Sequence, residues 1–171
     1  LQIKTLLSHS AFIGVEISAK DFFELLKKDS TGKLIKDFIE YYINQLREIL
    51  MKGRTPLFFT SRKELDFESQ SERLSFGLKF AKVMSEIICN LTPELGYIVS
   101  KGGITTQILL DHGLKYKSVT LKGQILPGLS VVLDSSDLNK SPIPIVTFPG
   151  NLGDQTTLLR SVEIMENLKF D

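Results

Sequence analysis

Hydrophobic positions recur along the chain in two periods, and segments with one period alternate with segments of the other. Spacings of three and four residues predict helices over residues 18–28, 33–51, 71–91, 107–113 and from Asp154 towards the C-terminus. Short runs rich in branched and aromatic residues predict strands over residues 11–17, 55–60, 95–99, 117–121, 129–133 and 143–147. This alternation is typical of an α/β fold, a layered domain with a mixed, mostly parallel sheet and helices on both faces.

Two of the predicted helices carry apolar stripes that we expect to face the core. Over residues 33–51 the stripe consists of Leu34, Phe38, Tyr41, Tyr42, Leu46 and Ile49. Over residues 71–91 it consists of Leu74, Leu78, Ala81, Met84 or Ser85, Ile88 and Leu91.

Local signals set the ends of other elements. Ser18 followed by Asp21 predicts a helix start, and the prolines around residues 143–147 favour an edge strand or a strand beginning.

The composition narrows the classes of partner. The 21 basic and 20 acidic residues nearly balance, so we expect no nucleic acid partner. No apolar run approaches the ~20 residues of a membrane helix, so we expect no membrane partner. The single cysteine, Cys89, excludes an internal disulfide framework and suits a cytoplasmic location. The 171 residues fit one domain without internal repeats, and the start at Leu1 rather than methionine predicts a processed product or a piece of a longer protein.

A glycine pair follows the strand predicted over residues 95–99, within the sequence Ser-Lys-Gly-Gly-Ile-Thr-Thr of residues 100–106. Glycines let a backbone approach a phosphate closely, and the N–H groups at a helix start point outward. Such a loop is suited to holding an anion. A tight turn that needs a positive φ angle and a helix cap explains the same residues, and the motif alone leaves both interpretations open.

A second glycine loop, residues 150–153, also stands directly before a predicted helix, which Asp154 can cap. Two such loops at the strand ends of one sheet would hold a phosphate chain between them. Asp134, Asp137 and Asp154 lie in predicted loops where they would meet a Mg²⁺-nucleotide, although aspartate is also an ordinary turn residue.

Several well-defined catalytic motifs are absent from the sequence. It contains neither a GxxxxGK[ST] phosphate loop nor a GxSxG serine elbow. The missing GxGxxG motif disfavours a dinucleotide-dependent oxidoreductase but does not exclude this class of enzyme. His9 and His112 are isolated and Cys89 has no partner cysteine, so no metal-ligand set is predicted. Arg62 and Lys63 follow the strand over residues 55–60, where they would face either a ligand or solvent.

Taken in order, three segments resemble the C-terminal nucleotide-binding domain of the four-carbon acid sugar kinase family. Residues 101–106 are similar to its GGDT-like loop, residues 123–130 to its GE-x-x-PGVP-like turn, and residues 148–154 to its KSGNFG-like loop. Four positions depart from that pattern. Ile104 replaces an acidic residue, Phe148 replaces a lysine, and Gln124 and Ser130 replace a glutamate and a proline.

The resemblance implies an ATP-binding domain, residues 1–171, of an enzyme that phosphorylates a threonate- or erythronate-like hydroxyl. ATP with Mg²⁺ would be the cofactor, and the acid sugar would be held by an N-terminal domain that is not present. Carried over by motif, Gly102, Gly103, Ile104, Thr105 and Gly150 would contact ATP, and no catalytic base can be named. The sequence leaves open whether the protein forms a homodimer. The altered residues support an alternative: a degenerate, non-catalytic ligand-binding or oligomerisation domain that keeps the fold.

Overall fold

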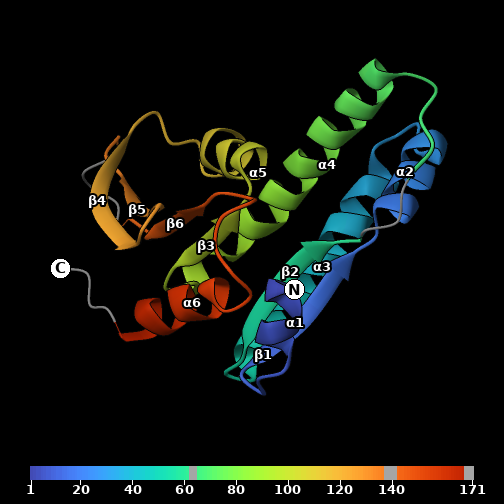
Figure 1. Cartoon of the computed structure of the whole chain (residues 1–171). Coiled ribbons are helices and arrows are strands. Elements are labelled where there is room, and N and C mark those ends of the chain that lie inside the picture. The colour runs from blue at the N-terminus through green and yellow to red at the C-terminus, as the bar shows by residue number, and fades with distance from the viewer. Residues whose placement is uncertain (62–64, 137–141, 168–171) are drawn as a thin grey trace.

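A computed structural model describes residues 1–61, 65–136 and 142–167 of the chain (Figure 1). Its helices are α1 (Gln2–Leu7), α2 (Ala19–Lys28), α3 (Lys33–Met51), α4 (Gln70–Leu91), η1 (Thr92–Glu94), α5 (Gly103–Ile108), the π-helical turn η2 (Leu109–Gly113) and α6 (Thr157–Asn167). Its strands are β1 (Phe12–Ile17), β2 (Thr55–Thr60), β3 (Ile98–Lys101), β4 (Val119–Leu126), β5 (Leu129–Asp134) and β6 (Ile145–Phe148). Every helix and strand that the periodicity predicts is present, with shifted ends in some cases.

The strands divide between two sheets. β1 and β2 form a parallel pair, while the second sheet has the order β3-β6-β5-β4. In that sheet β3 and β6 are parallel, and β5 is antiparallel to β6 on one side and to β4 on the other. The predicted α/β class, with a mixed sheet and helices on both sides, is confirmed. For the strand over residues 143–147 the prolines allowed either an edge strand or a strand beginning. The edge position is wrong, because β6 lies between β3 and β5. The strand beginning is confirmed, because Pro144 stands just before the first residue of β6.

Aromatic side chains build the core around β1 and β2. The ring of Phe22 in α2 lies 5.6 Å from Phe38, 5.9 Å from Phe76 and 5.2 Å from Phe80, measured between ring centroids. These contacts join α2 to both α3 and α4. Burying one such side chain stabilises the fold by roughly 1.5–3 kcal/mol, so the cluster fixes the three helices against one another.

The buried faces of α3 and α4 differ from the predicted stripes, and in α4 the phenylalanines decide which face is buried. Leu34 and Tyr41 of α3 are 44% and 56% exposed, and Leu74 and Leu78 of α4 are 61% and 41% exposed, so the predicted stripes are wrong at these positions. The buried positions are Ile39, Tyr42, Leu46 and Ile49 in α3, and Phe76, Phe80, Val83, Ile87 and Leu91 in α4. A phenylalanine buries more apolar area than a leucine, and the face that carries Phe76 and Phe80 therefore turns inward.

A second core lies on one face of the four-stranded sheet. Leu129, Val131, Val146 and Phe148 point towards α6, and Leu6 of α1 joins the same cluster. α5 and η2 pack between the sheet and α4. Figure 1 shows α4 running between this half of the molecule and the half that contains β1, β2, α2 and α3.

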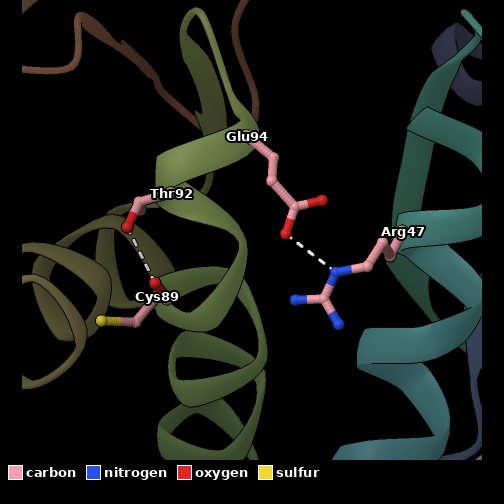
Figure 2. Close-up of polar contacts among 4 residues, drawn as sticks. All are labelled: Arg47, Cys89, Thr92 and Glu94. Atoms are coloured by element: carbon pink, nitrogen blue, oxygen red, sulfur yellow. Dashed lines mark hydrogen bonds and ion pairs between the residues drawn. The ribbon is translucent and has the colours of Figure 1, made fainter. Parts of the chain in front are cut away.

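A polar contact also links the two halves near the end of α4. The Nε of Arg47 in α3 donates to Oε1 of Glu94 in η1 at 2.8 Å, and Thr92 closes α4 by donating its hydroxyl to the carbonyl oxygen of Cys89 (Figure 2). Both charged side chains are partly exposed, so the ion pair contributes under about 1 kcal/mol. Within the described residues, no helix is both long enough and apolar enough to pass through a membrane.

Candidate functional site: the sheet edge where three turns meet

Three turns gather at one edge of the four-stranded sheet. β3 and β6 run parallel and end at Lys101 and Phe148, which are partners in the register. β5 runs the opposite way, so the hairpin turn at Pro127 and Gly128 lies at the same edge as the ends of β3 and β6. The carboxyl ends of parallel strands are where open α/β sheets gather ligands. The three segments are those that carry the kinase-family resemblance.

Direct contacts connect these turns. The backbone N–H of Gly102 donates to the carbonyl oxygen of Phe148 at 2.8 Å. A Cβ added to Gly150 would lie 3.8 Å from the Cα of Gly102, and one added to Gly128 would lie 2.9 Å from Cδ2 of Leu152. The second glycine loop therefore touches both the first glycine loop and the hairpin turn.

In the first loop the helix begins before the predicted residue 107. Gly102 has φ +106° and precedes α5, which starts at Gly103. Thr106 is inside the helix, where its buried hydroxyl donates to Oγ of the buried Ser100 at 2.9 Å. Thr106 therefore anchors the loop to β3, while Gly103 and Ile104 are exposed and Thr105 is half-buried. The loop is at once a positive-φ turn and an open backbone surface.

Hydrogen bonds from two sides fix the second loop. Asp154 accepts the backbone N–H groups of Thr156 and Thr157, each at 2.9 Å, which confirms its predicted role at the start of α6. The Thr156 hydroxyl and N–H, followed by the Thr157 hydroxyl, lower the pKa of Asp154 to about 2. From α1, Nε2 of Gln2 donates to the carbonyl oxygens of Leu152 at 3.2 Å and Asp154 at 2.6 Å.

The hairpin turn explains one departure from the family pattern. Oε1 of Gln124 accepts the backbone N–H of Gly128 at 3.3 Å, so this side chain closes the turn from within β4. A glutamate carboxylate at the same position can accept that N–H equally well. The change from glutamate to Gln124 therefore keeps the turn's hydrogen bond and removes a negative charge from the site.

Lys101 is a polar residue of this edge that the predicted site residues do not include. Its Nζ lies 3.8 Å from the centroid of the Phe148 ring and donates to the carbonyl oxygen of Pro149 at 3.2 Å. Phe148 itself is 1% exposed. Burial lowers the pKa of Lys101. The signal that would have found this contact is the pairing of β3 with β6, because it makes residues 101 and 148 neighbours.

The remaining candidates lie elsewhere. Asp134 ends β5 at the opposite end of the sheet from the glycine loops and accepts the N–H of Ser136, which agrees with the alternative of an ordinary turn residue. His112 lies in η2. Asp137, Arg62 and Lys63 fall outside the described residues. Across residues 1–61, 65–136 and 142–167, no group of three or more His, Cys, Asp or Glu side chains is placed to hold a metal ion.

A cavity of about 440 Å³ lies apart from this edge, between β1 and α3. Its lining includes the acidic residues Glu16 and Glu48 together with Tyr41 and Gln45. Two carboxylates repel a phosphate chain, whereas exposed backbone at Gly103 and the ammonium of Lys101 attract one. The charge of the two places therefore favours the glycine edge, rather than the cavity, as an anion site.

Two glycine loops that meet at the carboxyl ends of parallel strands define an α/β ligand-binding domain. The chain belongs to the family of nucleotide-binding C-terminal domains, whose sequence profile matches residues 1–158. The nucleotide-binding part of the predicted resemblance is thereby confirmed. Comparison with curated proteins gives no match.

Solved structures share the fold. A protein with a domain of unknown function, DUF1537, from Bordetella bronchiseptica, a domain-swapped dimer with bound citrate, superposes with a TM-score of 0.71 at 14% identity. That match covers 99% of this chain and 38% of the solved chain. A Salmonella typhimurium LT2 protein described provisionally as a tRNA synthase gives a TM-score of 0.62 at 16% identity, over 94% of this chain and 36% of that one. This chain thus spans little more than a third of either protein.

Proposed function

We propose that this chain is the ATP-binding domain of a kinase that phosphorylates a hydroxyl of a four-carbon acid sugar. The observation that carries the proposal is the contact between the Gly102–Gly103 loop and the Gly150 loop, within a chain of the nucleotide-binding C-terminal family. Phosphoryl transfer needs little covalent chemistry from the protein, and positioning with charge stabilisation supplies most of the catalysis. Two converging loops are suited to that task.

In this proposal the phosphates lie over the exposed backbone of Gly103, next to the half-buried Gly102, with the Thr105 hydroxyl and Gly150 beside them. Backbone N–H groups and hydroxyls are good donors to phosphate oxygens. Ile104 is 62% exposed and has no carboxylate, while the carboxylate of Asp154 is engaged by Thr156 and Thr157. Mg²⁺ would therefore arrive bound to ATP as part of the substrate, rather than on a set of protein carboxylates.

The acid sugar would be held by a separate N-terminal domain, in keeping with the 36–38% of the solved relatives' length that this chain covers. The Bordetella protein carries citrate, itself a hydroxy acid, and is a domain-swapped dimer. Both features support an acid substrate and a homodimer for this protein. The base that activates the sugar hydroxyl would come from the other domain, and a single cysteine agrees with a cytoplasmic location.

One observation favours a second candidate, a non-catalytic ligand-binding or oligomerisation domain. Ile104 presents an apolar side chain, 62% exposed, where the resembling kinases have an acidic residue. Phosphorylation of threonate or erythronate by the full-length protein with ATP would exclude this candidate. Binding of ATP without such turnover would support it.

A matched pair of glycine substitutions tests the proposed site. Gly103 and Gly77 both lie in helices, α5 and α4, and no atom of the described residues comes within 4 Å of a Cβ built on either. Neither substitution therefore creates a clash within the described fold. We expect Gly103→Val to weaken Mg²⁺-ATP binding at least tenfold in calorimetric titration, because its side chain occupies the space of a phosphate.

Gly77→Val should bind Mg²⁺-ATP as the wild type does, and both variants should melt within a few degrees of it. A folded wild-type chain without saturable ATP or ADP binding would overturn the proposal, and so would a Gly103→Val variant with unchanged affinity. Saturable NADH binding that ATP does not displace would instead favour an oxidoreductase.

A further inference from the structure

A lysine of β3 places a positive charge beside the two glycine loops. Position 148, where the resembling family has a lysine, holds Phe148, and this side chain is 1% exposed. Phe148 therefore supplies no donor to a ligand. Lys101, its register partner on the neighbouring parallel strand, places Nζ 3.8 Å from the centroid of the Phe148 ring. The charge missing from β6 is thus present on the adjacent strand.

Two contacts hold the ammonium at this point. The aromatic face of Phe148 attracts a cation, and the carbonyl oxygen of Pro149 accepts a hydrogen bond from Nζ at 3.2 Å. Pro149 directly precedes the second glycine loop, and Lys101 directly precedes Gly102 in the first. The side chain therefore spans the junction of the two loops. An ammonium has three N–H donors, and the bond to Pro149 occupies one of them.

We propose that Lys101 is a phosphate-binding residue of this site, and that Phe148 holds its ammonium between the two glycine loops. The proposal rests on the proposed nucleotide function. It assigns to β3 the cationic contact that the family pattern places on β6. The remaining donors of Nζ would bind phosphate oxygens through hydrogen bonds in which donor and acceptor are both charged, whereas a backbone N–H contributes no charge of its own. Partial burial of Nζ strengthens such an interaction, because fewer water molecules compete for the charge.

The test compares ligands that differ only in phosphate number. Lys101→Met, Lys101→Arg, Phe148→Leu and the control Lys122→Met, an exposed lysine of β4, would be titrated with Mg²⁺-ATP, Mg²⁺-ADP, AMP and adenosine. We expect Lys101→Met to lose about 10- to 100-fold in ATP affinity, the loss of hydrogen bonds to a charged group. Adenosine affinity should stay unchanged, since adenosine has no phosphate.

Lys101→Arg should keep most of the ATP affinity, because it retains the charge. Phe148→Leu, which removes the ring but keeps an apolar side chain, should cost a few-fold through poorer positioning. Lys122→Met removes the same charge elsewhere and should match the wild type. Each variant's melting temperature is recorded to separate binding from folding.

Three results would overturn the inference. If the wild type binds ATP and Lys101→Met binds it equally well, Lys101 makes no phosphate contact, while the proposed function stands. If Lys101→Met weakens ATP and adenosine by the same factor, the lysine only supports the fold of the loops. If the folded wild-type chain binds none of these ligands, the proposed function fails and the inference with it.

Discussion

Substitution of Gly128 by alanine is a demanding test of the contact between the hairpin turn and the second glycine loop. Gly128 has φ +80°, a backbone conformation that costs an L-residue about 1–2 kcal/mol. Its new Cβ would also lie 2.9 Å from Cδ2 of Leu152, closer than carbon atoms normally approach. The tip of a leucine side chain can move, so we place this second cost near 1 kcal/mol, the lower end for overpacking. The sum is about 2–3 kcal/mol.

Gly53→Ala provides the matched control. Gly53 follows α3 with φ +66°, and within the described part of the chain no atom lies within 4 Å of a Cβ built there. The free energy of unfolding of this variant should fall only by the conformational cost of about 1–2 kcal/mol. Denaturation of both variants in urea gives the two free energies of unfolding, whose difference isolates the contact with Leu152.

The same pair of variants tests the link to ligand binding. Movement of Leu152 shifts the loop that contains Gly150, so Gly128→Ala should weaken Mg²⁺-ATP binding several-fold, whereas Gly53→Ala should leave it unchanged. Equal free energies of unfolding and equal ATP affinities in the two variants would refute the geometry of this turn.

Two further predictions concern the anchors of the glycine loops. Thr106→Val keeps the shape of the buried side chain but removes the hydroxyl that Oγ of Ser100 contacts at 2.9 Å. The free energy of unfolding in urea should therefore fall by about 1–3 kcal/mol. An unchanged urea midpoint would show that this hydroxyl pair contributes nothing. Asp154 has its pKa lowered to about 2, first by the hydroxyl of Thr156, so the stability that this carboxylate adds is complete above the ordinary aspartate range near pH 4 and is lost as the pH falls towards 2. Melting curves of wild type and Asp154→Ala should therefore differ at pH 7 and converge near pH 2, and a constant difference across that range would contradict the assignment.

Local signals predicted the elements well because they depend on neighbouring residues. The helix over residues 33–51 and the strand over residues 55–60 are found with the bounds that the pattern indicates. Ser18 accepts the N–H of Asp21, as its capping signal requires. Boundaries near glycine were less predictable. β4 continues to Leu126 through a segment with register shifts, although Gly123 favoured a turn there.

The burial of the long helices needed information from outside each helix. Leu74 and Leu78 have helical spacing and are still exposed, because the phenylalanines of α4 meet Phe22 from α2. A single helix read alone offers two apolar faces, and only the partner decides between them. The need for glycine at position 113 also comes from another helix. A Cβ at Gly113 would lie 3.0 Å from the carbonyl oxygen of Ser85 in α4, so a larger residue would collide with α4.

The candidate site was predictable as three motifs but not as one place. Parallel pairing of β3 with β6 joins segments that lie far apart in sequence, and no short-range signal specifies such a pairing. That pairing brings Gly150 against Gly102 and places the ammonium of Lys101 over Phe148. Sequence alone identified Phe148 as a lost charge, and the contact with Lys101 became visible only in three dimensions.

Hydrogen–deuterium exchange of the backbone amides, with and without saturating Mg²⁺-ATP, tests the central claim most directly. We predict slower exchange in two separate segments, residues 102–106 and residues 150–153, because the same phosphate chain contacts both loops. Segments around β1 and α3, which line the acidic cavity, should exchange at unchanged rates. Protection confined to β1 and α3, or saturable binding with no protection in either glycine loop, would contradict the account.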